Sequence, residues 1–235
     1  MNKEIELFEN YIKKFDINNP KVKLKYDHTN RVVENAKIIS ESIGLDEKEK
    51  TRALVCALFH DLGRFPQVTE YNTFIDELSF DHGDKSHEIL NEWNYDDDIV
   101  KKAVKYHNKR EVPDFDELTN MHCKIVRDAD KIDIMLNFIN SPIDNNHDVD
   151  EETMNTIKEH KLLDNRSKMN EFLYGLRYLA YIFDINYKKT MEILLEHNVI
   201  DEKLNLLRCD RNKEQIDFIE KEIKEYIKER FDIIC

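Results

Sequence analysis

Histidine and aspartate side chains stand at three places in the sequence where the surrounding pattern is apolar. His28 lies on the apolar stripe of one predicted helix, and Asp130 lies on the stripe of another. His60 and Asp61 follow directly on an apolar run. A buried carboxylate needs a partner, because burying an unpaired charge is costly, and a divalent metal ion can satisfy imidazole and carboxylate groups together. The pattern predicts a metal centre with the ligands His28, His60, Asp61 and Asp130.

Each of these side chains also has an ordinary structural explanation when it is taken alone. A single histidine on an apolar face is more often a hydrogen-bonded core residue, and a lone aspartate commonly pairs with arginine or lysine. The pair His60-Asp61 fits a solvated helix end equally well. Only the ordered set, with each member on a predicted helix, indicates one shared site.

Two further histidines, His82 and His107, lie at the ends of predicted helices between Asp61 and Asp130. They are candidate ligands of a second metal ion. His87 is a weaker candidate for an acid or a substrate contact. The other histidines are expected to be structural or solvated: His122, His147, His160 and His197.

The elements that must position these residues are helices. The 235 residues include only four glycines and four prolines, too few for the tight turns of a β-sandwich or barrel. Apolar spacing predicts about ten helices and an all-α fold. The predicted segments cover residues 28–43, 46–61, 81–93, 96–107, 118–137, 151–163, 168–183, 187–198 and 212–231.

Local signals predict several helix ends. Gly44 is placed to end the first of these helices, and Asp46 with Glu49 reads as a capping box for the next. Gly63 and Pro66 are expected to stop that second helix, and the 141–142 Ser-Pro pair is expected to break the helix over 118–137.

Composition excludes several functions. The formal net charge is −13, which disfavours nonspecific binding to nucleic acid and docking on an anionic membrane. No apolar run approaches the length of a membrane span, and the N-terminal residues include acids where a signal peptide would be apolar. Four cysteines without a CxxC pair suit a reduced, cytoplasmic protein.

The ordered set of ligands resembles the signature of the HD-domain superfamily of metal-dependent phosphohydrolases, which is H…HD…D on a helical bundle. Residues 60–67, HDLGRFPQ, are similar to the HDIG variant, and residues 127–133, RDADKID, resemble the DADKLD stretch of the family. The segments around His82 and His107 resemble the additional histidines of bimetallic members. His107 is followed by Asn108, whereas some of these relatives carry a second histidine there, so a second ion would have fewer protein ligands.

The resemblance covers about residues 26–136. We expect a single all-α domain over residues 1–235, with an HD-type metal-binding core in that range and a C-terminal helical extension over about 150–235. Loops at 69–79 and 140–149 are expected to shape the substrate pocket, together with the C-terminal helices.

The resemblance implies one or two divalent ions, chosen from Mn, Fe, Mg, Co, Ni and Zn. A metal-bound water of lowered pKa would attack phosphorus, with Asp61 as the shared ligand and catalytic residue. Arg64 and Lys131, which follow the ligand motifs, are expected to bind the substrate phosphate. The implied reaction is hydrolysis of a phosphoester or phosphoanhydride bond in a nucleotide or another small phosphorylated metabolite.

Two other functions remain open at this point. A di-iron oxygenase on a similar helical scaffold would use the same ligands. A non-catalytic nucleotide-binding regulatory module could keep a structural metal, although retention of the whole ligand set argues against it.

Overall fold

The computed structural model describes residues 1–137, 143–164 and 169–234, and these residues confirm the all-α class. They contain helices and no strand. The chain divides into two compact units, residues 1–133 and 134–235, and the division falls inside one long helix. The single-domain organisation expected from the sequence stays a prediction.

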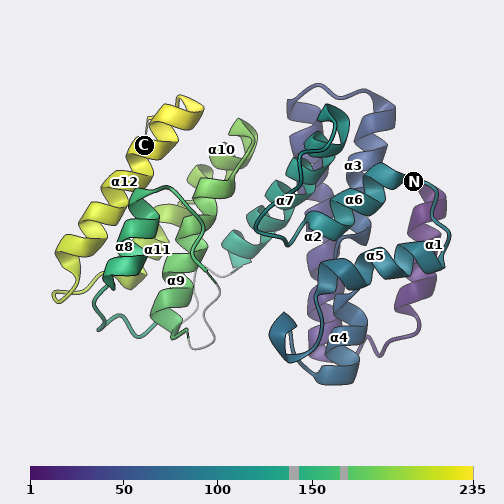
Figure 1. The fold of residues 1–235 in the computed structure, drawn as a ribbon, viewed down its shortest axis with the longest axis horizontal. Coiled ribbons are helices and arrows are strands. Elements are labelled where there is room, and N and C mark those ends of the chain that lie inside the picture. Colours follow the sequence, from purple (N-terminus) through teal and green to yellow (C-terminus); the bar gives the residue numbers. More distant parts are fainter. Residues whose placement is uncertain (138–142, 165–168, 235) are drawn as a thin grey trace. The chain divides into compact units, whose positions relative to one another are not determined.

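Unit 1 is a set of helices (Figure 1), and its buried core is rich in aromatic side chains. The helix α3 packs against α2 and α6, and α5 packs against α6 and α4. Phe65 is fully buried and contacts the rings of Phe8, Tyr11 and Phe15. The helices of this unit are α1 (Asn2–Ile12), α2 (Pro20–Ser42), α3 (Glu47–Phe59), α4 (Arg64–Tyr71), the 3-10 turn η1 (Asp76–Leu78), α5 (His82–Glu92), α6 (Asp98–Tyr106) and most of α7 (Glu117–Asn137).

The long helix α7 is joined to its neighbours by polar contacts. The Asn35 side chain of α2 donates a hydrogen bond to the carbonyl oxygen of Ala129 at 3.1 Å. The Arg127 guanidinium donates to the carbonyl oxygen of Tyr106, at the end of α6, at 3.0 Å. These bonds hold α7 beside the two helices whose residues it must meet at the candidate site.

Most of the predicted helix ends are confirmed. Gly44 has a φ of +69°, and the Asp46 carboxylate accepts a hydrogen bond from the Glu49 amide at 2.9 Å. Asp81 and Asp97 cap α5 and α6 in the same way. The predicted break at 141–142 lies outside the described residues.

The expectation at Gly63 and Pro66 is only half right. The helix α3 ends at Phe59, but α4 begins directly at Arg64 and occupies part of the segment expected to be a loop. Pro66 lies in the first turn of α4, where a missing amide hydrogen costs nothing because the first amides of a helix have no partner within it. The proline therefore marks a helix start.

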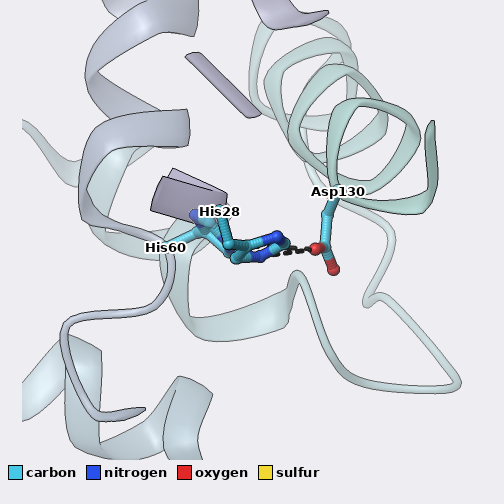
Figure 2. A group of neighbouring side chains, drawn as sticks. All are labelled: His28, His60 and Asp130. Atoms are coloured by element: carbon cyan, nitrogen blue, oxygen red, sulfur yellow. Dashed lines mark hydrogen bonds and ion pairs between the residues drawn. The ribbon is translucent and has the colours of Figure 1, made fainter. Parts of the chain in front are cut away.

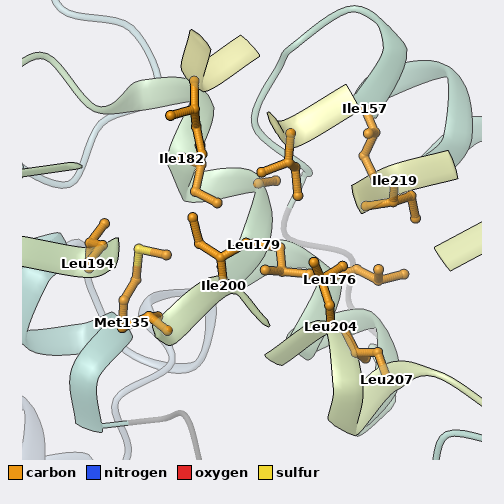
Figure 3. Packing of buried hydrophobic residues seen from close by; sticks show 14 of the residues in the cluster. Met135, Ile157, Leu176, Leu179, Ile182, Leu194, Ile200, Leu204, Leu207 and Ile219 are labelled. Carbon is orange, nitrogen blue, oxygen red and sulfur yellow. The ribbon is translucent and has the colours of Figure 1, made fainter. Parts of the chain in front are cut away.

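Unit 2 has its own apolar core (Figure 3). Leu176, Leu204 and Ile219 are among its fully buried residues, and they come from three different helices. The helices are α8 (Glu151–Lys158), α9 (Glu171–Ala180), the 3-10 turn η2 (Tyr181–Asp184), α10 (Lys188–Glu196), α11 (Val199–Leu207) and α12 (Lys213–Phe231). None of the helices described in either unit has both the length and the apolar character needed to cross a membrane.

Candidate metal centre

The side chains of His28, His60 and Asp130 meet in unit 1, although they come from three different helical segments (Figure 2). The Nε2 atom of His28 lies 3.1 Å from Oδ1 of Asp130 and 3.3 Å from Nε2 of His60. The Nε2 atom of His60 lies 3.8 Å from the same Asp130 oxygen. Both imidazoles are buried, whereas Asp130 is partly exposed. The predicted first group of ligands is therefore brought together.

The second pair of histidines meets on the other side of Asp61. The Nε2 atoms of His82 and His107 are 3.1 Å apart, and each lies 3.6 Å from Oδ1 of Asp61. The other oxygen, Oδ2, lies 3.4 Å from Nε2 of His28 and 3.5 Å from Nε2 of His60. Asp61 is buried between the two pairs. Its carboxylate faces one pair with each oxygen, which is the arrangement of a bridging ligand.

Two of the four imidazoles are oriented by backbone carbonyl groups. Nδ1 of His60 bonds the carbonyl oxygen of Ala57 at 2.7 Å, and Nδ1 of His107 bonds that of Val104 at 2.7 Å. Each histidine directly follows the last residue of its helix and reaches a carbonyl three residues back. Because a carbonyl oxygen only accepts, Nδ1 carries the hydrogen in both rings and Nε2 offers a lone pair to the centre.

The other two imidazoles are oriented by carboxylates. Nδ1 of His28 bonds Asp133 at 2.6 Å, and Nδ1 of His82 bonds Asp76 at 2.7 Å. Burial would raise the pKa of each carboxyl group, but hydrogen bonds from the histidines hold both below the usual range. The carboxylates are therefore ionised acceptors. Such partners fix the orientation of a histidine ligand and increase its basicity.

The facing Nε2 atoms show that imidazole and carboxylate groups here fit a metal ion. The Nε2 lone pairs of His82 and His107, which lie 3.1 Å apart, repel unless positive charge lies between them. Burial lowers the pKa of His60 to about 3 and that of His82 to about 4, so both rings are neutral, as metal ligands must be. Burial and Lys25 would also lower the pKa of His28, but the surrounding carboxylates raise it to about 10. The centre thus attracts positive charge, which a divalent ion would supply.

Arg64 and Lys131 were expected to bind phosphate, but Arg64 already donates to protein acceptors and Lys131 is buried. One Arg64 nitrogen, Nη1, donates to the side chains of Gln67 and Asp76 and to the carbonyl oxygen of Phe74, at 2.6, 2.9 and 2.7 Å respectively. Its Nε atom lies 3.7 Å from Oδ1 of Asp61. Lys131 is buried on α7, with 7% of its surface exposed. Their assignment as phosphate ligands stays a prediction.

Three residues of the site were not found from the sequence. Asp133 follows Asp130 by one helical turn, so its position on the same face was a usable signal. Lys25, which lies 2.7 Å from Oδ2 of Asp61, precedes His28 by one turn on α2. Asp76 lies in η1, where no periodic pattern places it beside His82.

Replacement of Asp76 by asparagine tests the orienting role of this carboxylate. We expect the affinity for an ion at the His82 and His107 pair to fall by roughly ten- to a hundredfold, because the ring loses its charged acceptor. Affinity at the His28 and His60 pair should be unchanged. Calorimetric titration with Mn²⁺ distinguishes the two steps. Glu70→Gln, which changes an exposed acid of α4, is the control, and equal titrations of both variants would contradict the assignment.

Unit 1 is therefore an all-α unit in which four buried imidazoles surround a shared carboxylate. This arrangement places the protein in the class of helical proteins with a candidate metal centre. Residues 26–135 match the family model described as HD domain. This match places residues 26–135 in the HD-domain superfamily, whose members are typically metal-dependent hydrolases. The matched range agrees with the core expected from the sequence. No curated protein and no solved structure matches the chain.

Proposed function

We propose that this protein is a metal-dependent phosphohydrolase that cleaves a phosphoester or phosphoanhydride bond in a nucleotide or another small phosphorylated metabolite. The observation that carries the proposal is the position of Asp61, whose two oxygens face the two histidine pairs. This arrangement suits a pair of divalent ions, and two-metal sites commonly catalyse phosphoryl transfer to water.

The chain would hold the first ion with His28, His60, Asp61 and Asp130, and the second with Asp61, His82 and His107. Bound divalent ions would lower the pKa of water and stabilise negative charge on phosphoryl oxygens. The protein residues fix the geometry: the four Nδ1 atoms are all tied to acceptors, so the ligand atoms cannot turn away. The partial exposure of Asp130 leaves the centre open on one side. Water can approach there.

Other parts of the proposal follow from the sequence. Arg64 and Lys131 remain proposed phosphate contacts, and the metal is one of Mn, Fe, Mg, Co, Ni and Zn. The net charge of −13 favours a small substrate over nucleic acid. The cysteine usage favours action in the cytoplasm.

Screening of the purified protein against nucleotides and generic phosphoesters tests the proposal. Each substrate is assayed with Mn²⁺, Mg²⁺, Co²⁺ and Ni²⁺ and with a chelator. We expect phosphate release that requires a divalent ion and is lost on chelation, because the water nucleophile depends on the ion. Bound metal without turnover of any substrate would contradict the proposed activity. A redox-active iron centre that consumes O₂ would instead support the di-iron oxygenase.

A further inference from the structure

A lysine reaches the candidate metal centre from the same helix that carries His28. The ammonium group of Lys25 lies 2.7 Å from Oδ2 of Asp61, the oxygen that faces His28 and His60. It also lies 5.6 Å from the centre of the Phe74 ring. The side chain is 14% exposed, so solvent reaches it at the centre. No ligand role in the motif accounts for this cation.

The neighbouring arginines are held by other acceptors. Arg31 donates to both oxygens of Asp133, at 2.5 and 3.1 Å. Arg64 donates through Nη1 to Asp76 and to its two other acceptors, while its Nε lies 3.7 Å from Asp61, beyond hydrogen-bond distance. Arg127 donates to three main-chain carbonyl groups. Lys25 differs, because it donates a hydrogen bond directly to Asp61, a proposed metal ligand, and an ammonium group has three hydrogens to donate.

We infer that Lys25 binds the phosphate of the substrate, and that it competes with the metal ion for Asp61. This inference rests on the proposed function. A divalent ion and the ammonium group both require the lone pairs of the same carboxylate oxygen, so metal binding weakens the contact between Lys25 and Asp61. Because the lysine side chain is flexible, its ammonium group can then move to the nearest anion. At a centre of this chemistry, the nearest anion is a phosphoryl group held at the metal.

The inference predicts two opposite effects of one substitution. Lys25→Met keeps the length and the apolar stem of the side chain but removes its charge. Affinity for Mn²⁺ alone should increase, because a competing cation is gone from Asp61. Affinity of the Mn²⁺-loaded protein for inorganic phosphate should fall by roughly tenfold or more, because a charge-assisted hydrogen bond is lost. A purely structural lysine would not produce this pair of changes.

The experiment is a calorimetric titration in two stages, first with MnCl₂ and then with inorganic phosphate. Lys25→Arg keeps a cation at the position and should retain most of the phosphate affinity, which also covers the case in which Lys25→Met folds poorly. Lys23→Met is the matched control, because Lys23 lies on the same helix and forms an exposed ion pair with Asp27. The control should bind Mn²⁺ and inorganic phosphate with the same affinities as the protein of unchanged sequence.

The outcomes separate the inference from the proposed function. Unchanged phosphate affinity in Lys25→Met, with metal and phosphate binding intact in the unchanged protein, overturns the role of Lys25 alone. A decrease in Mn²⁺ affinity in Lys25→Met overturns the competition and makes Lys25 a support of Asp61. If the unchanged protein binds Mn²⁺ but no phosphate, or binds no Mn²⁺, the proposed function fails together with the inference.

Discussion

Replacement of Asp61 by alanine is expected to abolish metal binding and hydrolysis together. Asp61 is the only side chain in the described structure that faces both histidine pairs, so its loss removes a ligand from each. A divalent ion that acts in hydrolysis contributes several kcal/mol to transition-state stabilisation, so we expect activity to fall by on the order of a thousandfold or more. Elemental analysis of the purified variant measures metal content, and phosphate release measures activity.

Stability must be measured alongside, because the substitution also leaves Lys25 without its carboxylate partner. Thermal unfolding of the metal-free proteins shows whether the variant is folded at the assay temperature. Asp27→Ala is the matched control, since this carboxylate lies on α2 in an exposed pair with Lys23. A folded Asp61→Ala protein with full metal occupancy would show that Asp61 is not the shared ligand.

The helical scaffold was predictable because it depends on local patterns. The apolar stripe of residues 118–137 agrees with α7 to within one residue, and Asp46 caps α3 as its spacing with Glu49 indicated. The helix α11 was not predicted as a separate element. The predicted segments end at residue 198 and resume at residue 212, whereas α11 occupies Val199–Leu207 and follows Asn198, which takes a positive φ of 53°. Asparagine tolerates this conformation, but sequence alone does not require it.

The proposed ligands could be predicted from the sequence, whereas the side chains that orient them were not predicted. His28, His60-Asp61 and Asp130 are polar residues on apolar stripes, and this conflict is visible in one sequence. The contact of Asp76 with His82 depends on how the chain folds between α4 and α5. The partners of Arg64 depend on the same segment, so a motif position could suggest a phosphate ligand without showing that three acceptors already surround it.

Gly63 illustrates how the backbone itself constrains the centre. It lies two residues after Asp61, against the first turn of α5, which carries His82. Its amide donates to the Ser86 hydroxyl at 2.8 Å. A Cβ atom at this position would overlap the carbonyl oxygen of His82 and would lie 2.9 Å from Cβ of Lys85. Any side chain here must displace α5 and, with it, His82, a proposed ligand of the second ion.

Gly63→Ala is therefore expected to destabilise unit 1 and to weaken the second metal site. Overpacking of this kind costs about 1–3 kcal/mol. Gly44→Ala is the matched control, because a Cβ there would meet nothing within 4 Å and only the positive φ opposes it. Gly44→Ala should cost about 1 kcal/mol and leave metal binding unchanged. Urea unfolding and Mn²⁺ titration compare the two variants. If Gly63→Ala loses no more Mn²⁺ affinity than Gly44→Ala, then α5 does not transmit the clash to His82, and close backbone packing is not what positions the second histidine pair.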